Sequence, residues 1–354
     1  MTISEPIPFD QLHRFVAQSL ATTSMPDEQA RIVADTLVST DAMGVYTHGT
    51  KLLIGYIKKL QAGGYDPRAL PVIERQGPAW AILDGKSALG MIGCHAAMKL
   101  AVQKAKQTGI AYVGLKATAH VGAIGYYASL GARLGCITMV TGNDIPSVAA
   151  PGSRTAVLGS NPIAYGIPRL HADPIILDMA TSATAGGKVY AACQRGEPIP
   201  DTWLIGPDGR PTTDGSLYPA QASLAPMAGH KGYGIGLWCE ILSAILPGGH
   251  HTWNVGSWLF DDPSKPSNHT ASITAIDVSV ISDPQRFDTQ LQALVDQIHQ
   301  APRAEGSSGV LLPGEREWSR FHLAKSQGIP LPSDVLDKLK LVAQSTGIVA
   351  DWLR

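Results

Sequence analysis

A histidine in the segment Asp41 to Tyr56, DAMGVYTHGTKLLIGY, has the chemistry and the predicted position for proton transfer. Gly44 suits the left-handed end of one helix, and the hydroxyl of Thr47 suits the N-cap of the next. His48 would then lie in the first turn, where the helix dipole disfavours imidazolium. An imidazole that exchanges a proton near pH 7 is what general acid–base catalysis needs. In the alternative interpretation, Thr47 caps the helix and His48 is an ordinary polar residue of its first turn.

Two glycine-rich or polar segments lie at predicted strand ends. In Ala119 to Tyr127 a strand runs into a helix, and His120 opens that helix among small residues that let a flat ring approach. In Ile175 to Ser182 an apolar strand ends in Asp, Thr and Ser, whose oxygens and free backbone N–H groups suit the phosphates or ribose of a ligand. The alternatives are a histidine satisfied by backbone groups in the first segment and ordinary helix capping in the second.

Two further segments combine glycine with charge. Met227 to Gly234 places Lys231 amid glycines, a cation beside a backbone that a phosphate can approach. Leu312 to Glu317, LPGERE, offers Gly, Glu and Arg together. A solvated lysine explains the first equally well, and a plain charged turn explains the second. Each of the four segments is unspecific by itself, and it is their occurrence in one chain that needs an explanation.

Familiar nucleotide and metal motifs are absent from the sequence. It has no G-x-G-x-x-G after a strand, no G-x-x-x-x-G-K-[ST] and no H-E-x-x-H. The run Gly232-x-Gly234-x-Gly236 has the wrong spacing for a dinucleotide turn. The adjacent His250 and His251 point in different directions, so the sequence predicts no metal site.

Composition narrows the class of protein. The chain has 354 residues, of which 44% are hydrophobic and 16% charged, and a formal net charge of −1. This describes a globular protein with a sizeable core, and the near-zero charge excludes nucleic acid and anionic membrane surfaces as expected partners. We recognise no signal peptide and no apolar stretch long enough to span a bilayer. The four cysteines form no CxxC pair, which fits free thiols in a reducing cytoplasm.

Helices are predicted where His48 must be positioned. Apolar stripes predict helices over 9–20, 26–43 and 48–62, the last ending at Gly63-Gly64. In the third, Leu52, Tyr56 and Leu60 recur every four residues on the side of His48. We therefore expect His48 to lie on the face of this helix that packs inward.

From about residue 79 the pattern changes to short apolar runs separated by turn residues. Strands are predicted over 80–83, 110–115, 136–141 and 175–177, and helices over 95–107, 287–300 and 332–346. The sequence thus predicts an α+β fold, with a helical domain made of residues 1–75 and 284–354 and a sheet-rich cofactor-binding domain over 76–283, with or without a small inserted subdomain. Residues 261–270 are expected to form a mobile loop without a functional hint.

Blocks along nearly the whole chain resemble the malate/L-lactate dehydrogenase family of the second type. That family also contains ureidoglycolate, sulfolactate and diketogulonate dehydrogenases and piperideine-carboxylate reductases. The blocks, in order, are GVYTHG around His48, HVGAIGYY, LGSNPIAYGIP, LDMATS, GGK, RGEPIPDTW, GRPTTDG, GHKGYG and LPGERE.

The resemblance implies a homodimer with its active site near the subunit interface and a non-Rossmann nicotinamide-binding mixed sheet. It implies hydride transfer between NAD, with NADP left open, and a 2-hydroxy or 2-oxo acid. His48 would be the proton donor, His120 the alternative catalytic base, and Thr47 and Asp178 would orient the ring. The residues expected to contact the cofactor are Met179, Ala180, Thr181, Ser182, His230, Lys231, Gly314, Glu315 and Arg316.

Departures from the family pattern concern the residues expected to face the substrate. The family usually has an arginine where this chain has Leu52, and Lys51 could replace it only as a point charge. Asp144 follows Asn143 where threonine or serine is usual, and it adds a negative charge. Two alternatives therefore stay open: a cyclic imine acid or ureidoglycolate-like substrate in the same fold, and a nicotinamide-nucleotide binder without catalysis. A preference for NADP would need a basic group at the ribose, for which the candidates are Arg154, Lys188 and Arg195.

Overall fold

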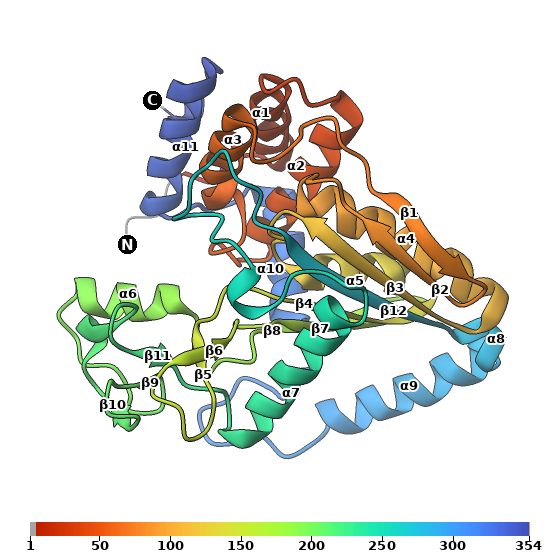
Figure 1. Cartoon of the computed structure of the whole chain (residues 1–354). Coiled ribbons are helices and arrows are strands. Elements are labelled where there is room, and N and C mark those ends of the chain that lie inside the picture. The colour runs from red at the N-terminus through yellow and green to blue at the C-terminus, as the bar shows by residue number, and fades with distance from the viewer. Residues whose placement is uncertain (1–4, 354) are drawn as a thin grey trace.

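The computed structural model describes residues 5–353, which form two β-sheets with helices around them (Figure 1). Within these residues the larger sheet has seven strands in the order β1-β2-β3-β12-β4-β7-β8. Only β2 and β3 pair in parallel, so the sheet is mixed and the predicted α+β class is confirmed. The strands are β1 (Val72–Gly77), β2 (Trp80–Asp84), β3 (Ile110–Thr118), β4 (Cys136–Gly142), β7 (Ile163–Ile167), β8 (Ile175–Met179) and β12 (His269–Asp277).

Strand β12 lies in the middle of this sheet, antiparallel to β3 and β4. Most of its residues are buried, on both faces of the sheet, so it lacks the polar–apolar alternation that marks a half-exposed strand. The sequence-based prediction did not identify it. The prediction of a mobile loop over 261–270 is wrong at its end, because His269 and Thr270 already belong to β12.

Helices cover both faces of the large sheet. On β3, Ala111, Val113 and Leu115 share a buried cluster with α4 (Gly90–Thr108) and α5 (Ile124–Arg133). The neighbouring Tyr112 points to the other face, where its hydroxyl donates to the carbonyl of Leu242 at 2.6 Å. That face carries α7 (His230–Glu240) and the π-helical turn η3 (Ile241–Ile245) that continues it. Alternation along the strand thus separates the two layers.

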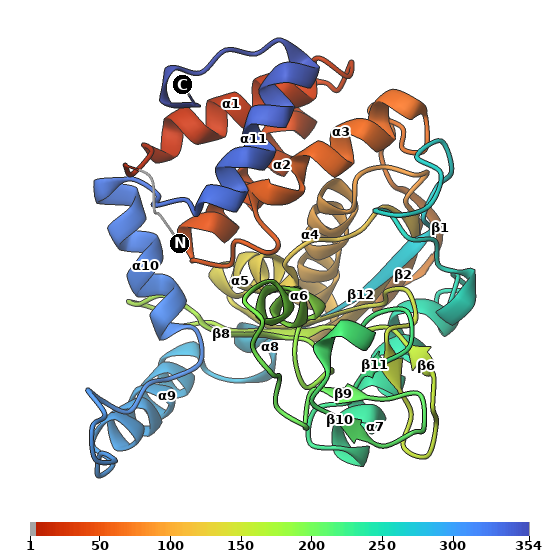
Figure 2. The same cartoon turned by 90° about the vertical axis from the view of Figure 1, so that its left-hand side faces the viewer.

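A separate helical cluster joins the two ends of the chain. It contains α1 (Phe9–Ala21), α2 (Asp27–Ala42), α3 (Leu53–Ala62) and α11 (Ser333–Thr346), with α11 lying close to α1 and α3 (Figure 2). Ile7 and Ile329 form a two-way backbone bridge between the ends. Fully buried leucines such as Leu12, Leu37 and Leu339 fill the interior, each stabilising the fold by about 1.5–3 kcal/mol.

Two helices lie along the edge strand β8. In α9 (Pro284–His299), Val295 packs against Ile175 and Leu312. In α10 (Glu315–Gln327), the Trp318 indole N–H donates to the carbonyl of Pro174 at 2.7 Å. Residues 312–317 are therefore not a plain charged turn, because Glu315 begins a helix.

A smaller sheet of five strands lies beside the large one and has its own apolar cluster. Its strands are β10 (Pro211–Thr212), β9 (Leu204–Ile205), β11 (Ser223–Leu224), β5 (Val148–Ala149) and β6 (Ala156–Leu158), and α6 (Gly186–Gln194) packs on them. None of the helices within residues 5–353 combines the length and the apolarity needed to cross a membrane.

Candidate functional site

His48 lies at the edge of a stack of aromatic rings. Its ring centroid is 5.9 Å from that of His120, and the His120 ring is 4.7 Å from the ring of Trp258 and nearly parallel to it. On the same side, the Tyr56 hydroxyl lies 2.8 Å from Nδ1 of His120. The two histidines expected from the sequence are thus brought together by tertiary packing, and Trp258 is an addition that the sequence did not reveal.

The turn that carries His48 differs from the predicted one. The α-helix begins at Leu53, after a 3-10 turn over Thr50–Leu52, so His48 precedes the helix and Thr47 is not its N-cap. The reason is a tertiary contact: the buried carboxylate of Asp41 accepts the backbone N–H of Thr50 at 3.0 Å and also its hydroxyl. Thr47 instead places its hydroxyl 3.0 Å from Nδ1 of His48.

Burial rather than a helix dipole lowers the pKa of His48. Desolvation is the larger influence, and the negative charge of Asp144 partly opposes it. The direction agrees with the expectation from the sequence although the cause differs. His48 is therefore mainly neutral at pH 7 and a stronger acid than a free imidazole when protonated.

His120 is held neutral more firmly. Burial, followed by the neighbouring His269 and His48, lowers the pKa of His120 to about 3. A base of that strength is poorly matched to proton transfer near pH 7. Of the two histidines, His48 has the better pKa for that role.

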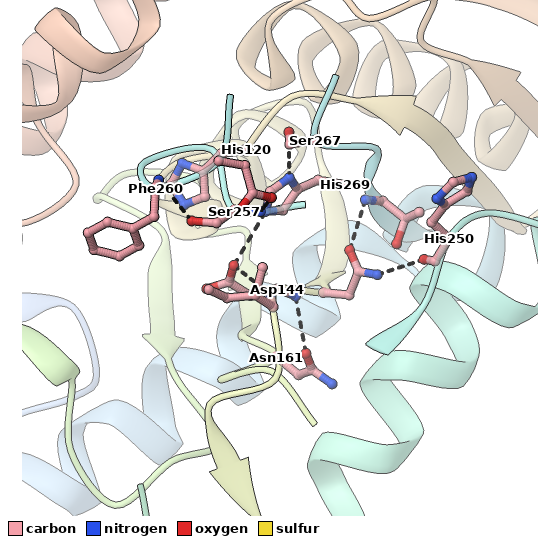
Figure 3. A network of polar contacts seen from close by, with 12 residues as sticks. His120, Asp144, Asn161, His250, Ser257, Phe260, Ser267 and His269 are labelled. Carbon is pink, nitrogen blue, oxygen red and sulfur yellow. Dashed lines mark hydrogen bonds and ion pairs between the residues drawn. The ribbon is translucent and has the colours of Figure 1, made fainter. Parts of the chain in front are cut away.

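Asp144 belongs to a polar network beside His120 (Figure 3). Its Oδ1 lies 3.3 Å from Nε2 of the buried His269, whose Nδ1 lies 2.9 Å from the Ser267 hydroxyl. Burial raises the pKa of Asp144, but the hydrogen bond from His269 and the charges of His269 and His120 outweigh it, so that the pKa falls below its usual value. The sequence reasoning missed His269 and Ser267, which fall in the segment expected to be a mobile loop.

Both asparagines near Asp144 have structural partners. The amide of Asn143 donates to the carbonyl of His250 at 2.9 Å and accepts the N–H of Thr270 at 2.9 Å, which ties it to backbone at both ends. Asn161, not singled out from the sequence, accepts the N–H of Asp144 at 3.3 Å and donates to Oε2 of the buried Glu240 at 2.6 Å. These amides fix the backbone that carries Asp144.

Leu52, which occupies the position of the family arginine, and Lys51, the expected substitute for its charge, both lie in structural contacts. The ammonium of Lys51 is 2.6 Å from Oδ2 of Asp334 on α11. Leu52 is partly buried and packs against the helical cluster. Lys51 therefore forms an ion pair with Asp334, and Leu52 can give a substrate only apolar contacts.

The four glycine-rich or polar segments converge on β8 and the turn that follows it. Met227 donates its N–H to the carbonyl of Thr181 at 2.9 Å, which joins the third segment to the second. Gly314 packs on the strand so closely that a Cβ would lie 2.4 Å from Cγ1 of Ile176. At the first segment, Gly125 donates its N–H to Asp178. Their common location explains why four unspecific segments occur in one chain.

Asp178 lies against a helix start rather than against the ring of His48. Its Oδ2 accepts the N–H of Gly125 at 2.7 Å in the first turn of α5, where the helix dipole favours an anion. Burial raises the pKa of Asp178 to about 6, although the Gly125 hydrogen bond opposes this shift. Among residues 5–353, no hydrogen bond joins Asp178 to His48.

Several residues expected at the cofactor already have partners. The Thr181 hydroxyl donates to the carbonyl of Ser160 at 3.0 Å, and the Ser182 hydroxyl to that of Thr184 at 2.8 Å. Glu315 lies 2.8 Å from Nε2 of His299. Those three side chains hold the turn and the helix start. Met179 and Ala180 are half-buried beside them, and the exposed ones are His230, Lys231 and Arg316.

The group of segments around β8 has features that suit an anionic nucleotide. The first turn of α7 carries His230 and Lys231, and helix N-termini bind phosphates through free N–H groups. At Gly232 a Cβ would lie 2.1 Å from the carbonyl oxygen of Met227, so only glycine lets the helix approach its own preceding loop this closely. The cationic Lys231 and a tight backbone are therefore both found at the start of α7, next to the turn that follows β8.

Comparison with known proteins gives concordant results. A sequence profile described as malate/L-lactate dehydrogenase matches residues 7–340. The malate dehydrogenase of Pyrococcus abyssi is 34% identical over 349 residues, covering 97% of this chain and 95% of that protein. The ureidoglycolate dehydrogenase (NAD(+)) of Escherichia coli K12 is 31% identical, with 93% of each chain covered. The crystal structure of malate dehydrogenase from Entamoeba histolytica superposes with a TM-score of 0.92 at 27% identity, over 99% of this chain and 100% of that one.

Proposed function

The chain belongs to the malate/L-lactate dehydrogenase family, and we propose that it transfers hydride reversibly between a nicotinamide cofactor and C2 of a 2-hydroxy or 2-oxo acid. Family membership confirms the resemblance drawn from the sequence blocks. The observation that carries the proposal is the position of His48: a histidine with a lowered pKa, held by Thr47 and stacked beside a neutral His120. Such an imidazole can exchange a proton with the substrate oxygen.

His48 performs the proton transfer in this proposal. It gives its proton to the carbonyl oxygen in reduction and takes it from the hydroxyl in oxidation. Thr47 lies at Nδ1, which leaves Nε2 for the substrate. The neutral ring of His120, which Tyr56 and Trp258 hold in place, positions the substrate. When bound, the reduced nicotinamide supplies the hydride.

The cofactor would lie along the segments that meet at β8. Met179 and Ala180 would contact it at the strand end, His230 and Lys231 at the start of α7, and Gly314 and Arg316 at the start of α10. Thr181, Ser182 and Glu315 would hold these segments in shape through their internal bonds.

NAD is the cofactor that we propose. The Escherichia coli relative is named for it, and Arg195, one of the basic candidates for a ribose phosphate, is already 2.7 Å from Glu197. Dissociation constants for NADH and NADPH, measured by fluorescence, would test the choice. Tighter binding of NADPH would contradict it.

A homodimer is supported by an exposed apolar face on α7 and η3. Its large side chains are each 40–55% exposed: Leu237, Trp238, Ile241, Ile245 and Leu246. Leu237, Ile241 and Ile245 recur every four residues, the spacing of one helix face, and an exposed apolar face is typical of a protein interface. We therefore propose that a second copy covers it. Light scattering should give about twice the chain mass of 37.4 kDa, and a monomer would contradict the proposal.

We also propose a cytoplasmic location, because the four free thiols fit a reducing compartment.

The decisive experiment is reduction of a panel of 2-oxo acids and cyclic imines with NADH and NADPH, followed by absorbance of the reduced cofactor. His48→Gln should lower kcat by about 10²–10⁴-fold, the contribution of a general acid, while cofactor binding persists. Near-normal turnover of this variant would move the proton role to His120 or to water. Cofactor binding without turnover of any acid or imine would favour the non-catalytic alternative. Its support is that Leu52 replaces the family arginine and that Lys51 is paired with Asp334.

A further inference from the structure

An accessible carboxylate lies near the ring stack that contains His48: Asp144 contacts His269, whose ring centroid is 5.7 Å from that of His120. Asp144 keeps 31% of its side chain exposed although it lies in a polar network. Its Oδ1 accepts the N–H of Ile145 at 2.8 Å and meets Nε2 of His269 at 3.3 Å. Its Oδ2 has no hydrogen-bond partner within the part of the chain that the structure describes, so this oxygen is free to meet a ligand.

The charge of Asp144 reaches the groups that line the site. It raises the pKa of His48 and of His120, although burial lowers both overall. It also adds to the rise in the pKa of Tyr218, which burial dominates, on the side of the smaller sheet. His48, His120 and Tyr218 therefore all lie within reach of the negative charge of Asp144.

Two of the lysines that follow His48 in the sequence, Lys51 and Lys59, are engaged elsewhere. Lys51 pairs with Asp334 at 2.6 Å. The ammonium of Lys59 donates to the carbonyls of Asp262 and Lys265 at 3.1 and 2.7 Å. With Leu52 apolar, neither lysine is placed to neutralise the carboxylate of Asp144.

From this arrangement we infer that Asp144 sets the charge preference of the site, and this inference rests on the proposed dehydrogenase function. A substrate whose group beyond C3 carries a second carboxylate is disfavoured by Asp144. A substrate whose corresponding group donates hydrogen bonds or carries a positive charge is favoured. The C1 carboxylate is common to all 2-hydroxy acids, so it cancels from the comparison. A like-charge contact lowers affinity, whereas a donor on Oδ2 forms a charge-assisted hydrogen bond.

Two probes of equal shape isolate this effect. Oxaloacetate ends in a carboxylate, and 2-oxosuccinamate, its amide, ends in a neutral donor. Both are reduced at C2 by the same hydride and proton transfer. We expect kcat/KM of the wild-type protein to be at least tenfold higher for the amide. Asp144→Asn should raise kcat/KM for oxaloacetate relative to that for the amide at least tenfold and bring the two values together. Higher ionic strength should also narrow the difference.

A matched control removes one negative charge on α9, away from Asp144 and His48. Asp296→Asn changes an exposed residue of α9 whose partner is Gln292, and the ratio between the two probes should stay at the wild-type value. A wild-type preference for oxaloacetate would overturn the inference. So would an unchanged ratio between the two probes in Asp144→Asn, which would mean that Asp144 only holds His269.

Failure of the underlying function has a different signature. If neither probe nor any other 2-oxo acid is reduced with NADH or NADPH, the dehydrogenase proposal itself fails. If other 2-oxo acids are reduced but neither probe is, the function stands and the role of Asp144 is refuted.

Discussion

The hydroxyl of Tyr56 lies 2.8 Å from Nδ1 of His120, and both rings stack with Trp258. Tyr56 comes from α3, His120 from the loop between β3 and α5, and Trp258 from the loop before β12. The contact therefore ties three distant segments together beside His48. Because burial keeps Tyr56 protonated by raising its pKa well above 10, it can donate to the neutral His120 ring.

Tyr56→Phe should weaken the substrate positioning that we propose for His120 while leaving the proposed proton transfer by His48 in place. Removal of one buried hydrogen-bond partner costs about 1–3 kcal/mol, so we expect kcat/KM to fall about five- to hundredfold, with most of the loss in KM. Steady-state kinetics measures the split. A fall in kcat alone would show that Tyr56 takes part in the proton transfer.

The pH dependence follows from the lowered pKa of His48. In the proposed mechanism, reduction needs the protonated imidazole of His48, so kcat/KM for reduction should fall as pH rises through that pKa. Oxidation needs the neutral imidazole and should rise through the same pKa, which lies below 6.5. Asp144→Asn removes a charge that raises the pKa of His48, so both limbs should move to lower pH. Profiles of kcat/KM against pH for both directions provide the measurement, and an unchanged or upward-shifted limb would contradict the assignment.

Local sequence signals predicted most helices and several strands. These elements bury one side, so their apolar residues recur with the period of a helix or a strand. The helix ending at Ala62 has Gly63 in a left-handed conformation with a φ of 85°, as the Gly-Gly pair indicates. Strand β12 was missed because a central strand buried on both faces has no period of two. That omission also hid His269, the partner of Asp144.

The start of α3 could not be predicted from its own residues. Thr47 is a good N-cap by type, yet Asp41, nine residues before Thr50, captures the backbone N–H instead. The same limit applies to Lys51, whose partner Asp334 is 283 residues away. Side chains that meet across the fold decide these contacts, and a single sequence does not show which ones meet.

Gly49→Ala tests the contact that shapes the His48 turn. A Cβ at this position would lie 1.8 Å from Oδ1 of Asp41, so the turn must move to accommodate it. We expect a loss of about 1–3 kcal/mol in the free energy of unfolding, as for other overpacked sites, together with a fall in kcat because His48 shifts. Urea unfolding and steady-state kinetics measure the two effects.

Gly187→Ala is the matched control for that substitution. Gly187 lies in α6, and a Cβ there would meet no atom within 4 Å. Its stability should stay the same or rise by up to about 1 kcal/mol, since alanine favours a helix over glycine. If Gly49→Ala behaved like this control, the packing of Asp41 against Gly49 would not determine the turn.

Lys231→Ala tests the cofactor site that we propose at the start of α7. The ammonium is exposed, and the structure shows no ion pair for it among residues 5–353. If it contacts a cofactor phosphate, its loss removes a charge-assisted hydrogen bond worth about 1.5–3 kcal/mol. The dissociation constant for NADH should then rise about ten- to hundredfold, measured by fluorescence titration. Lys338→Ala, an exposed lysine on α11, should leave that constant unchanged, because α11 packs with the chain ends and not along β8. Equal affinities for the Lys231 variant and the wild type would remove this lysine from the cofactor site and leave the phosphates to the backbone of α7 and to Arg316.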